Sequence, residues 1–211
     1  MKRGKKILAF LLIITMFLPF VMNIPAEAAE KSKQLDVLFT HDTHSHLNSF
    51  STIVDGEQKE VGGFAKLKTL IDERKKEKPD TLILDGGDFS MGTLIQTVYD
   101  TEAAELRMLG YLGCDVSTLG NHEFDYRSKG LADMLTAAKD SGETVPSLVV
   151  CNVDWDSMEK NGLSEGQKQI QSAFENYGVK DYVVVQKGDV KIAVVGVFGV
   201  DALKCAPTCE L

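Results

Sequence analysis

The sequence lacks low-complexity tracts, internal repeats and any clear linker. It is also poor in tryptophan (1), proline (5), cysteine (4) and histidine (4). Its 211 residues are 44% hydrophobic and 26% charged, which is an ordinary globular mix. A chain of this length can bury the core of one domain, so intrinsic disorder is excluded as the starting interpretation.

Excess positive charge is missing as well. The formal net charge is −8, from 23 lysines and arginines against 31 aspartates and glutamates. Proteins bind nucleic acid polymers through basic patches, so no nucleic acid partner is expected. A small anionic substrate is still compatible with this charge, because a bound metal ion reverses the field locally.

The first thirty residues differ from the rest. Four basic residues precede an uncharged apolar run over residues 7–22, and Ala26 and Ala28 then supply the small side chains that a signal peptidase reads. This order predicts a signal peptide at 1–28, cleaved to give an exported protein that is secreted or associated with the cell envelope. The alternative is an uncleaved anchor, but the run is short for a membrane span and Pro19 interrupts it. No span is expected after cleavage.

An exported chain with four cysteines allows three disulfide pairings. Cys114 and Cys151 stand in apolar runs, which favours buried free thiols. Cys205 and Cys209 are four residues apart and are candidates for a local disulfide.

After the signal, apolar runs alternate with amphipathic stretches, which predicts an α/β domain. The predicted strands are 35–40, 81–84, 116–119, 147–151, 182–186 and 190–198, the last two joined by a tight turn at 187–189. The predicted helices are 63–76, 101–112 and 129–141. Residues 153–180 are polar and weakly patterned, and we interpret them as an insertion with one helix.

Three polar clusters each follow a predicted strand: His41 to His46 (HDTHSH), Asp85 to Asp88 (DGGD) and Gly120 to Asp125 (GNHEFD). Taken alone, each has an ordinary explanation as a turn, a helix cap or a surface pair. Open α/β sheets bind ligands at the carboxyl ends of their strands, so we expect the three clusters to share one edge. Their aspartate, histidine and asparagine donors suit Mg, Mn, Fe or Zn.

These motifs resemble the calcineurin-like metallophosphoesterases. The segment GNHEFD, with FTHDTHSHL and VGGFAKLKTLI, is similar to the 5'-nucleotidase branch, which includes 2',3'-cyclic nucleotide phosphodiesterases. The likeness covers about residues 36–198. It implies a layered α/β/β/α sandwich that is incomplete at the C-terminus, with residues 29–211 as the N-terminal part of the family domain.

The resemblance also implies roles for particular residues. The implied metal ligands are Asp42, His44, Asp88 and Asn121, with Asp88 bridging two divalent ions. The implied catalytic residues are His122, which assists the leaving group, and Asp125, which orients it. Two ions would activate a hydroxide and neutralise an anionic ester, and a positioned acid would help to expel the alcohol.

The sequence departs from the family pattern in places. His41 replaces an asparagine, and Ser45 stands where glycine is common. His46 matches a family histidine that is not a ligand. No histidine follows His122 to supply the family's later ligands, and no nucleotide-base domain follows, so we expect a fragment.

Three functions stay open. The first is two-metal hydrolysis of nucleoside 5'-monophosphates or related nucleotides. The second is hydrolysis of cyclic nucleotides or nucleotide sugars. The third is a non-catalytic exported domain that binds a metal or a partner. The identity of the metals and the oligomeric state are left open by the sequence.

Overall fold

The computed structural model describes residues 33–211, so the predicted signal peptide and its cleavage point lie outside the described residues. Residues 35–211 form one folding unit. Among residues 33–211, no helix is long and apolar enough to cross a membrane.

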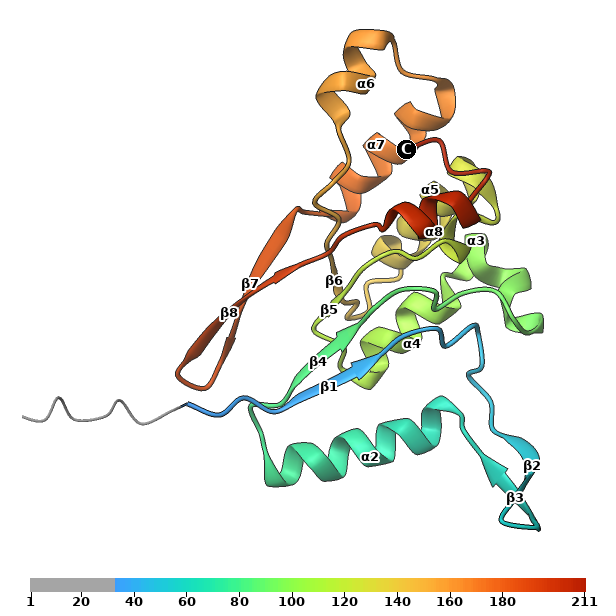
Figure 1. Cartoon of the computed structure of the whole chain (residues 1–211), viewed down its shortest axis with the longest axis vertical. Coiled ribbons are helices and arrows are strands. Elements are labelled where there is room, and N and C mark those ends of the chain that lie inside the picture. The colour runs from blue at the N-terminus through green and yellow to red at the C-terminus, as the bar shows by residue number, and fades with distance from the viewer. Residues whose placement is uncertain (1–32) are drawn as a thin grey trace, which may run out of the picture. The chain divides into compact units, whose positions relative to one another are not determined.

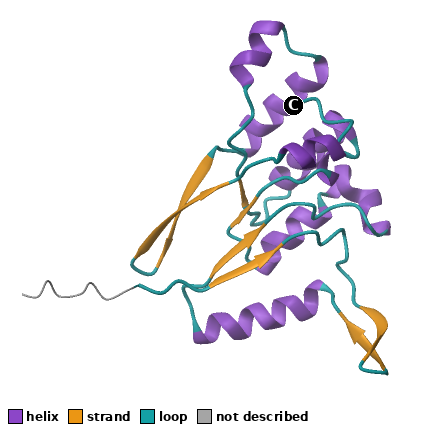
Figure 2. Ribbon diagram, in the orientation of Figure 1, coloured by secondary structure: helices purple, strands orange, loops and turns teal. Residues whose placement is uncertain are grey.

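A four-stranded parallel sheet forms the centre of this unit (Figures 1 and 2). Its order is β1-β4-β5-β6, and its strands are β1 (Val37–Thr40), β4 (Leu82–Asp85), β5 (Val116–Ser117) and β6 (Ser147–Leu148). Thr40 pairs with Asp85, and Leu84 with Val116. The first four predicted strands are confirmed, although β5 and β6 are shorter than expected.

Helices supply the rest of the core. The longer ones are α2 (Phe64–Glu77), α4 (Ala104–Leu112), α5 (Arg127–Asp140) and α7 (Glu165–Tyr177). The shorter ones are η1 (Leu94–Val98), α3 (Tyr99–Glu102), η2 (His122–Phe124), α6 (Trp155–Asn161) and α8 (Val200–Cys205). Leu106, Leu131 and Ile170 are fully buried and bring α4, α5 and α7 into one cluster with the sheet. The predicted α/β class is confirmed.

Two helix predictions were wrong in detail. The helix predicted at 101–112 is interrupted at Ala103, whose φ of 47° ends α3 and starts α4. The segment 153–180 holds two helices rather than one. Both begin with a side-chain cap: Asp154 accepts from the amide of Ser157, and Ser164 and Gln167 form a reciprocal capping box.

Two antiparallel ribbons lie outside the parallel sheet (Figure 2). β7 (Tyr182–Lys187) and β8 (Val190–Val195) form the predicted hairpin, and Tyr182, Val184 and Val195 on it are more than half exposed. β2 (Phe50–Val54) and β3 (Glu57–Val61) form a hairpin that the sequence did not predict.

The cysteines are all free thiols. Cys114 is buried, as predicted, whereas Cys151 is only half-buried. Cys205 is exposed at the end of α8 and Cys209 is half-buried, with no disulfide between them.

Candidate active site

The three polar clusters meet at one edge of the parallel sheet. Because β1, β4 and β5 are parallel neighbours, the loops that follow them leave the sheet at the same end. The amides of Asp42 and His44 donate to the carbonyl oxygens of Gly87 and Asp88, each at 3.1 Å. The amide of His122 donates to Asp88 Oδ1 at 2.8 Å. Asp88 thus links the loop after β1 (residues 41–46) to the loop after β5 (residues 120–125).

Two glycines allow this close approach. Gly87 has a φ of +88°, and a Cβ added there would lie 2.5 Å from the amide nitrogen of Gly120. A Cβ added at Gly120 would lie 2.3 Å from Asp88 Oδ1. Larger side chains at either position would separate the second loop from the third.

Left-handed backbone conformations concentrate in the same loops. Asp42, His44, Ser45 and Asp88 have φ values of 51°, 44°, 54° and 51°. Residues with a Cβ adopt this region rarely, and each instance costs on the order of 1–3 kcal/mol unless the surroundings hold it. Three of these four are predicted metal ligands, so the strain lies where the predicted chemistry lies.

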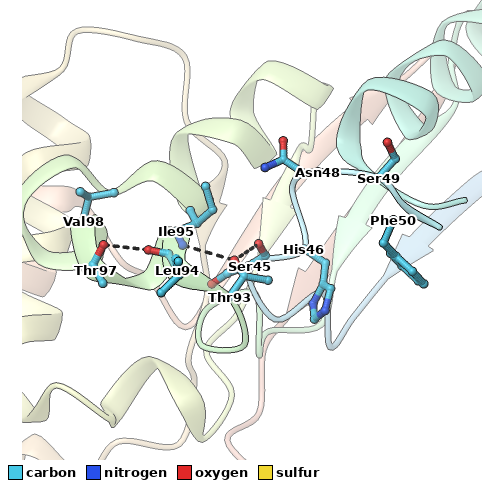
Figure 3. Close-up of a pocket in the computed structure, with 10 residues that line it drawn as sticks. All are labelled: Ser45, His46, Asn48, Ser49, Phe50, Thr93, Leu94, Ile95, Thr97 and Val98. Atoms are coloured by element: carbon cyan, nitrogen blue, oxygen red, sulfur yellow. Dashed lines mark hydrogen bonds between the residues drawn. The ribbon is translucent and has the colours of Figure 1, made fainter. Parts of the chain in front are cut away.

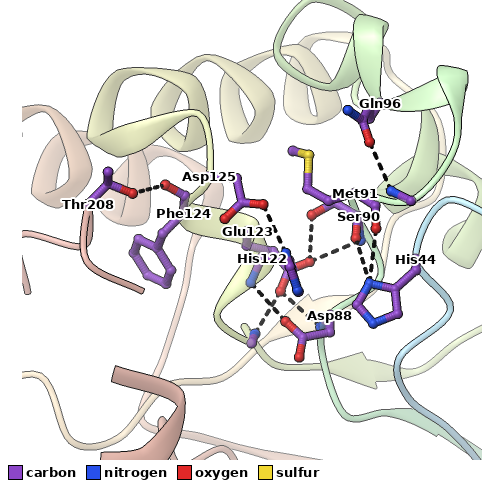
Figure 4. Close-up of polar contacts among 12 residues, drawn as sticks. His44, Asp88, Ser90, Met91, Gln96, His122, Glu123, Phe124, Asp125 and Thr208 are labelled. Carbon is purple, nitrogen blue, oxygen red and sulfur yellow. Dashed lines mark hydrogen bonds and ion pairs between the residues drawn. The ribbon is translucent and has the colours of Figure 1, made fainter. Parts of the chain in front are cut away.

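His122 and Asp125 form a hydrogen-bonded pair (Figure 4). His122 Nδ1 lies 2.8 Å from Asp125 Oδ2. Partial burial alone would lower the pKa of His122, but the hydrogen bond and charge of Asp125, with the charges of Asp88 and Glu123, raise it above its ordinary value. The His122 ring packs edge-on against that of His44, with centroids 4.9 Å apart. The pair can therefore present a protonated imidazole beside the Asp88 loop.

The ring of His44 is oriented by backbone oxygens. Its Nδ1 lies 3.0 Å from the carbonyl oxygen of Met91 and 3.3 Å from that of Ser90 (Figure 4). A carbonyl only accepts, so Nδ1 carries the proton and the lone pair is on Nε2. Metal-binding histidines usually have this arrangement, in which one ring nitrogen donates to an oxygen and leaves the other free for the metal.

Asp42 is held as a carboxylate. His41 Nδ1 lies 2.8 Å from its Oδ2, and this hydrogen bond is the main reason that the pKa of Asp42 is lowered. Desolvation opposes the shift, and Asp88 and His44 add to it. Asn121 lies in the same edge cluster, half-exposed between Gly120 and His122.

The donor types of Asp42, His44, Asp88 and Asn121 fit a divalent ion of the Mg, Mn, Fe or Zn kind. Among residues 33–211, no group of three or more histidine, cysteine, aspartate or glutamate side chains is arranged so that it could hold a metal ion. The assignment of these four residues as ligands therefore stays a prediction.

Glu123 is a site residue that the sequence reasoning missed. It is fully buried, and its carboxylate accepts hydrogen bonds from the amides of Asp88 (2.9 Å), Ser90 (3.1 Å) and Gly120 (2.7 Å) and from the hydroxyl of Ser90 (2.9 Å). Burial raises the pKa of Glu123 to about 7, although the hydrogen bonds from Gly120 and Ser90 act to lower it. Its only sequence signal was its place in GNHEFD. Its hydrogen bonds join the loop that contains Asp88 and Ser90 to the loop that contains Gly120.

An open cavity of about 720 Å³ lies beside the first loop (Figure 3). Ser45, His46 and Phe50 line one side of it, and Thr93 and Leu94 line the other. Leu94 is 86% exposed and Phe50 50% exposed, so the cavity offers apolar surface next to the polar edge.

Comparisons with known proteins point to one family. The calcineurin-like phosphoesterase family model matches residues 35–192. The 5'-nucleotidase of Rattus norvegicus is 40% identical over 116 residues, which cover 53% of this chain and 20% of the relative. The NAD 5'-nucleotidase of Haemophilus influenzae is 32% identical over 118 residues, covering 54% of this chain and 19% of the relative.

A solved structure is also similar. The 5'-nucleotidase precursor from Thermus thermophilus superposes with a TM-score of 0.62 at 28% identity, covering 80% of this chain and 29% of that one. The chain thus spans only 19–29% of the length of these three relatives.

Proposed function

Because this chain belongs to the calcineurin-like phosphoesterase family, we propose that it carries the N-terminal part of an exported phosphoesterase that hydrolyses nucleotides, with nucleoside 5'-monophosphates as the first candidates. The observation that carries the proposal is the His122–Asp125 pair beside Asp88, at the edge where three strands end. The names of the relatives, 5'-nucleotidase and NAD 5'-nucleotidase, support the nucleotide class.

The residues that would hold two divalent ions are Asp42, His44, Asp88 and Asn121. Such ions, when bound, neutralise a phosphate and supply hydroxide near neutral pH. The chain's own acid is His122. Asp125 accepts a hydrogen bond from Nδ1–H of His122 and so directs Nε2–H towards the oxygen of the departing alcohol. When the phosphorus–oxygen bond breaks, that proton passes to the alkoxide and leaves a neutral imidazole.

The apolar cavity begins at Ser45 and His46, the two residues that follow the proposed ligand His44 in the chain. An exposed aromatic ring at Phe50 and an exposed leucine at Leu94 are surfaces on which the non-phosphate part of an ester can rest. This supports an organic phosphate rather than inorganic pyrophosphate as the substrate. Export of the protein is proposed from the basic, apolar and small-residue order of its first 28 residues alone.

The test is phosphate release from a nucleoside monophosphate and from an aryl phosphate with excess Mn²⁺. The assay uses two proteins: the 211-residue chain, and the product of the longest open reading frame that contains this chain. His122→Ala should lower turnover by ~10²–10⁴-fold, the usual contribution of a general acid. Lys129→Ala is the control, because Lys129 is an exposed residue of α5 paired with Asp133. Turnover that His122→Ala leaves unchanged would overturn the mechanism. Metal binding without turnover by either protein would favour the non-catalytic alternative.

A further inference from the structure

Ser45 follows His44 in the first site loop, which we define as residues 41–46. Its φ of +54° is a conformation that serine rarely adopts, and the residue is fully buried. Its amide donates to the carbonyl oxygen of Phe89 at 2.9 Å. Its own carbonyl oxygen accepts from Thr93 Oγ1 at 2.8 Å (Figure 3). Both backbone groups of this strained residue are therefore fixed.

The side chain of Ser45 is fixed as well, by a buried carboxylate. Ser45 Oγ donates to Glu105 Oε1 at 2.6 Å. Glu105 lies in the first turn of α4 and is 1% exposed. Its other oxygen, Oε2, is buried and has no hydrogen-bond partner among residues 33–211.

A carboxyl group in this position lowers the stability of the fold. A buried polar group with an unpaired oxygen is less favourable than an apolar side chain of the same size. Glu105 touches neither His122 nor Asp88 through any described hydrogen bond. Its hydrogen bond goes to Ser45 in the first site loop, so we expect it to stabilise the conformation of that loop.

Ser45 follows His44 in the chain, and the position of His44 is tightly constrained by its neighbours. The amide of His44 donates to the carbonyl oxygen of Asp88 at 3.1 Å, and its ring Nδ1 reaches the carbonyl oxygen of Met91. A Cβ added at Gly92 would lie 2.3 Å from the carbonyl oxygen of His44. A shift of Ser45 would therefore disturb the bonds that set the orientation of the His44 ring.

We propose that Glu105 is a positioning residue: through the Ser45 hydroxyl it holds the first site loop in its left-handed conformation and fixes the ring of His44. The metal-binding consequence rests on the proposed function, because it assumes that His44 is a ligand. The effect on the loop does not. Glu105 is not a catalytic residue, since Ser45 stands between it and the site.

The main variant is Glu105→Met, which keeps an unbranched side chain of similar length and removes the acceptor. In the 211-residue chain without added metal, the amides of His44 and Ser45 should exchange with deuterium at least about tenfold faster than in the wild type. The ¹⁵N signals of His44 should change from one Nδ1–H tautomer towards a mixture.

Three further variants make the test specific. Glu105→Gln keeps a carbonyl oxygen for the Ser45 hydroxyl and should behave as the wild type. Ser45→Gly removes the hydroxyl and also relieves the strain, yet it should accelerate exchange at His44 as Glu105→Met does. Leu109→Met, one turn further along α4 and equally buried, is the matched control and should leave exchange at His44 unchanged.

The proposal is overturned if Glu105→Met and Ser45→Gly leave exchange and tautomer as in the wild type, or if Glu105→Gln is as disruptive as Glu105→Met. If Glu105→Met does not fold, Ser45→Gly decides the matter alone. A titration with Mn²⁺ should also show at least about tenfold weaker binding for Glu105→Met and unchanged binding for Glu105→Gln. A wild type that binds no Mn²⁺ counts against the proposed function, whereas the exchange data still decide the role of Glu105.

Discussion

Gly120 is a position where even the smallest substitution should disturb the candidate site. An added Cβ would lie 2.3 Å from Asp88 Oδ1, 2.5 Å from Asp88 Cγ and 2.7 Å from the Asp88 amide nitrogen. Ordinary contact begins near 3.4 Å, so the Cβ would be about 0.7–1.1 Å too close to three atoms of one residue. Asp88 cannot withdraw freely, because its amide is bound to Glu123 and its carboxylate to the amide of His122.

Gly120→Ala should therefore lower stability by ~1–3 kcal/mol, the usual cost of overpacking. For a chain of this size, 1 kcal/mol corresponds to about 2–4 °C, so the melting temperature should fall by about 2–12 °C. The same change should weaken Mn²⁺ binding, because the displaced group is the predicted bridging carboxylate. Thermal unfolding followed by circular dichroism, with and without Mn²⁺, measures both effects.

Gly199→Ala is the matched control. Gly199 has a φ of −68°, and an added Cβ there meets nothing within 4 Å. Alanine at this N-cap position causes no clash, so the melting temperature of the variant should stay close to that of the wild type. Equal melting temperatures for the two variants would refute the argument that the second and third loops are in tight contact.

Four other outcomes are expected. In a chain that turns over substrate, Asp88→Asn should cost more activity than His46→Ala when both are assayed with excess Mn²⁺, because an amide cannot supply the charge of the bridging carboxylate; equal losses would contradict the ligand assignment. Burial raises the pKa of Asp85, so the folded state holds its proton more tightly and the stability of the wild type falls as pH rises above the unfolded pKa of ~3.9. The free energy of unfolding of Asp85→Asn should therefore rise relative to that of the wild type as the pH is raised above about 4, and a difference that does not change with pH would argue otherwise. Ser164→Ala removes a capping box and should cost ~1 kcal/mol in the same assay, a loss that an unchanged urea midpoint would disprove. N-terminal sequencing of exported protein should begin after Ala28, and purely cytoplasmic protein with an intact N-terminus would contradict export.

Short apolar runs were sufficient to predict the first strands of the α/β domain and its polar edge. The run Leu35 to Thr40 and the run Thr81 to Leu84 are short, apolar and followed by turn residues, and β1 and β4 lie there. The convergence of the three clusters followed from strand direction alone, because parallel neighbours end at the same edge.

The remaining features depend on contacts between distant residues. The hairpin of β2 and β3 is mostly exposed, and neither FSTIV nor EQKEV alternates between apolar and polar residues, so the sequence carries no strand period there. In the sequence, nothing distinguishes the two buried carboxyl groups, Glu105 in a predicted helix and Glu123 in GNHEFD, from solvated acidic residues. Their roles depend on serine hydroxyls 60 and 33 positions away. A single sequence without such distances cannot separate a buried acceptor from a solvated charge.

The β7–β8 ribbon has a practical consequence for all of these measurements. Tyr182, Val184 and Val195 expose apolar surface on a two-stranded sheet, and such surfaces attract further strands. Self-association would bury this surface and make the apparent melting temperature depend on protein concentration. Variants should therefore be compared at equal, low concentration, with light scattering recorded alongside, so that a change in association is not mistaken for a change in folding.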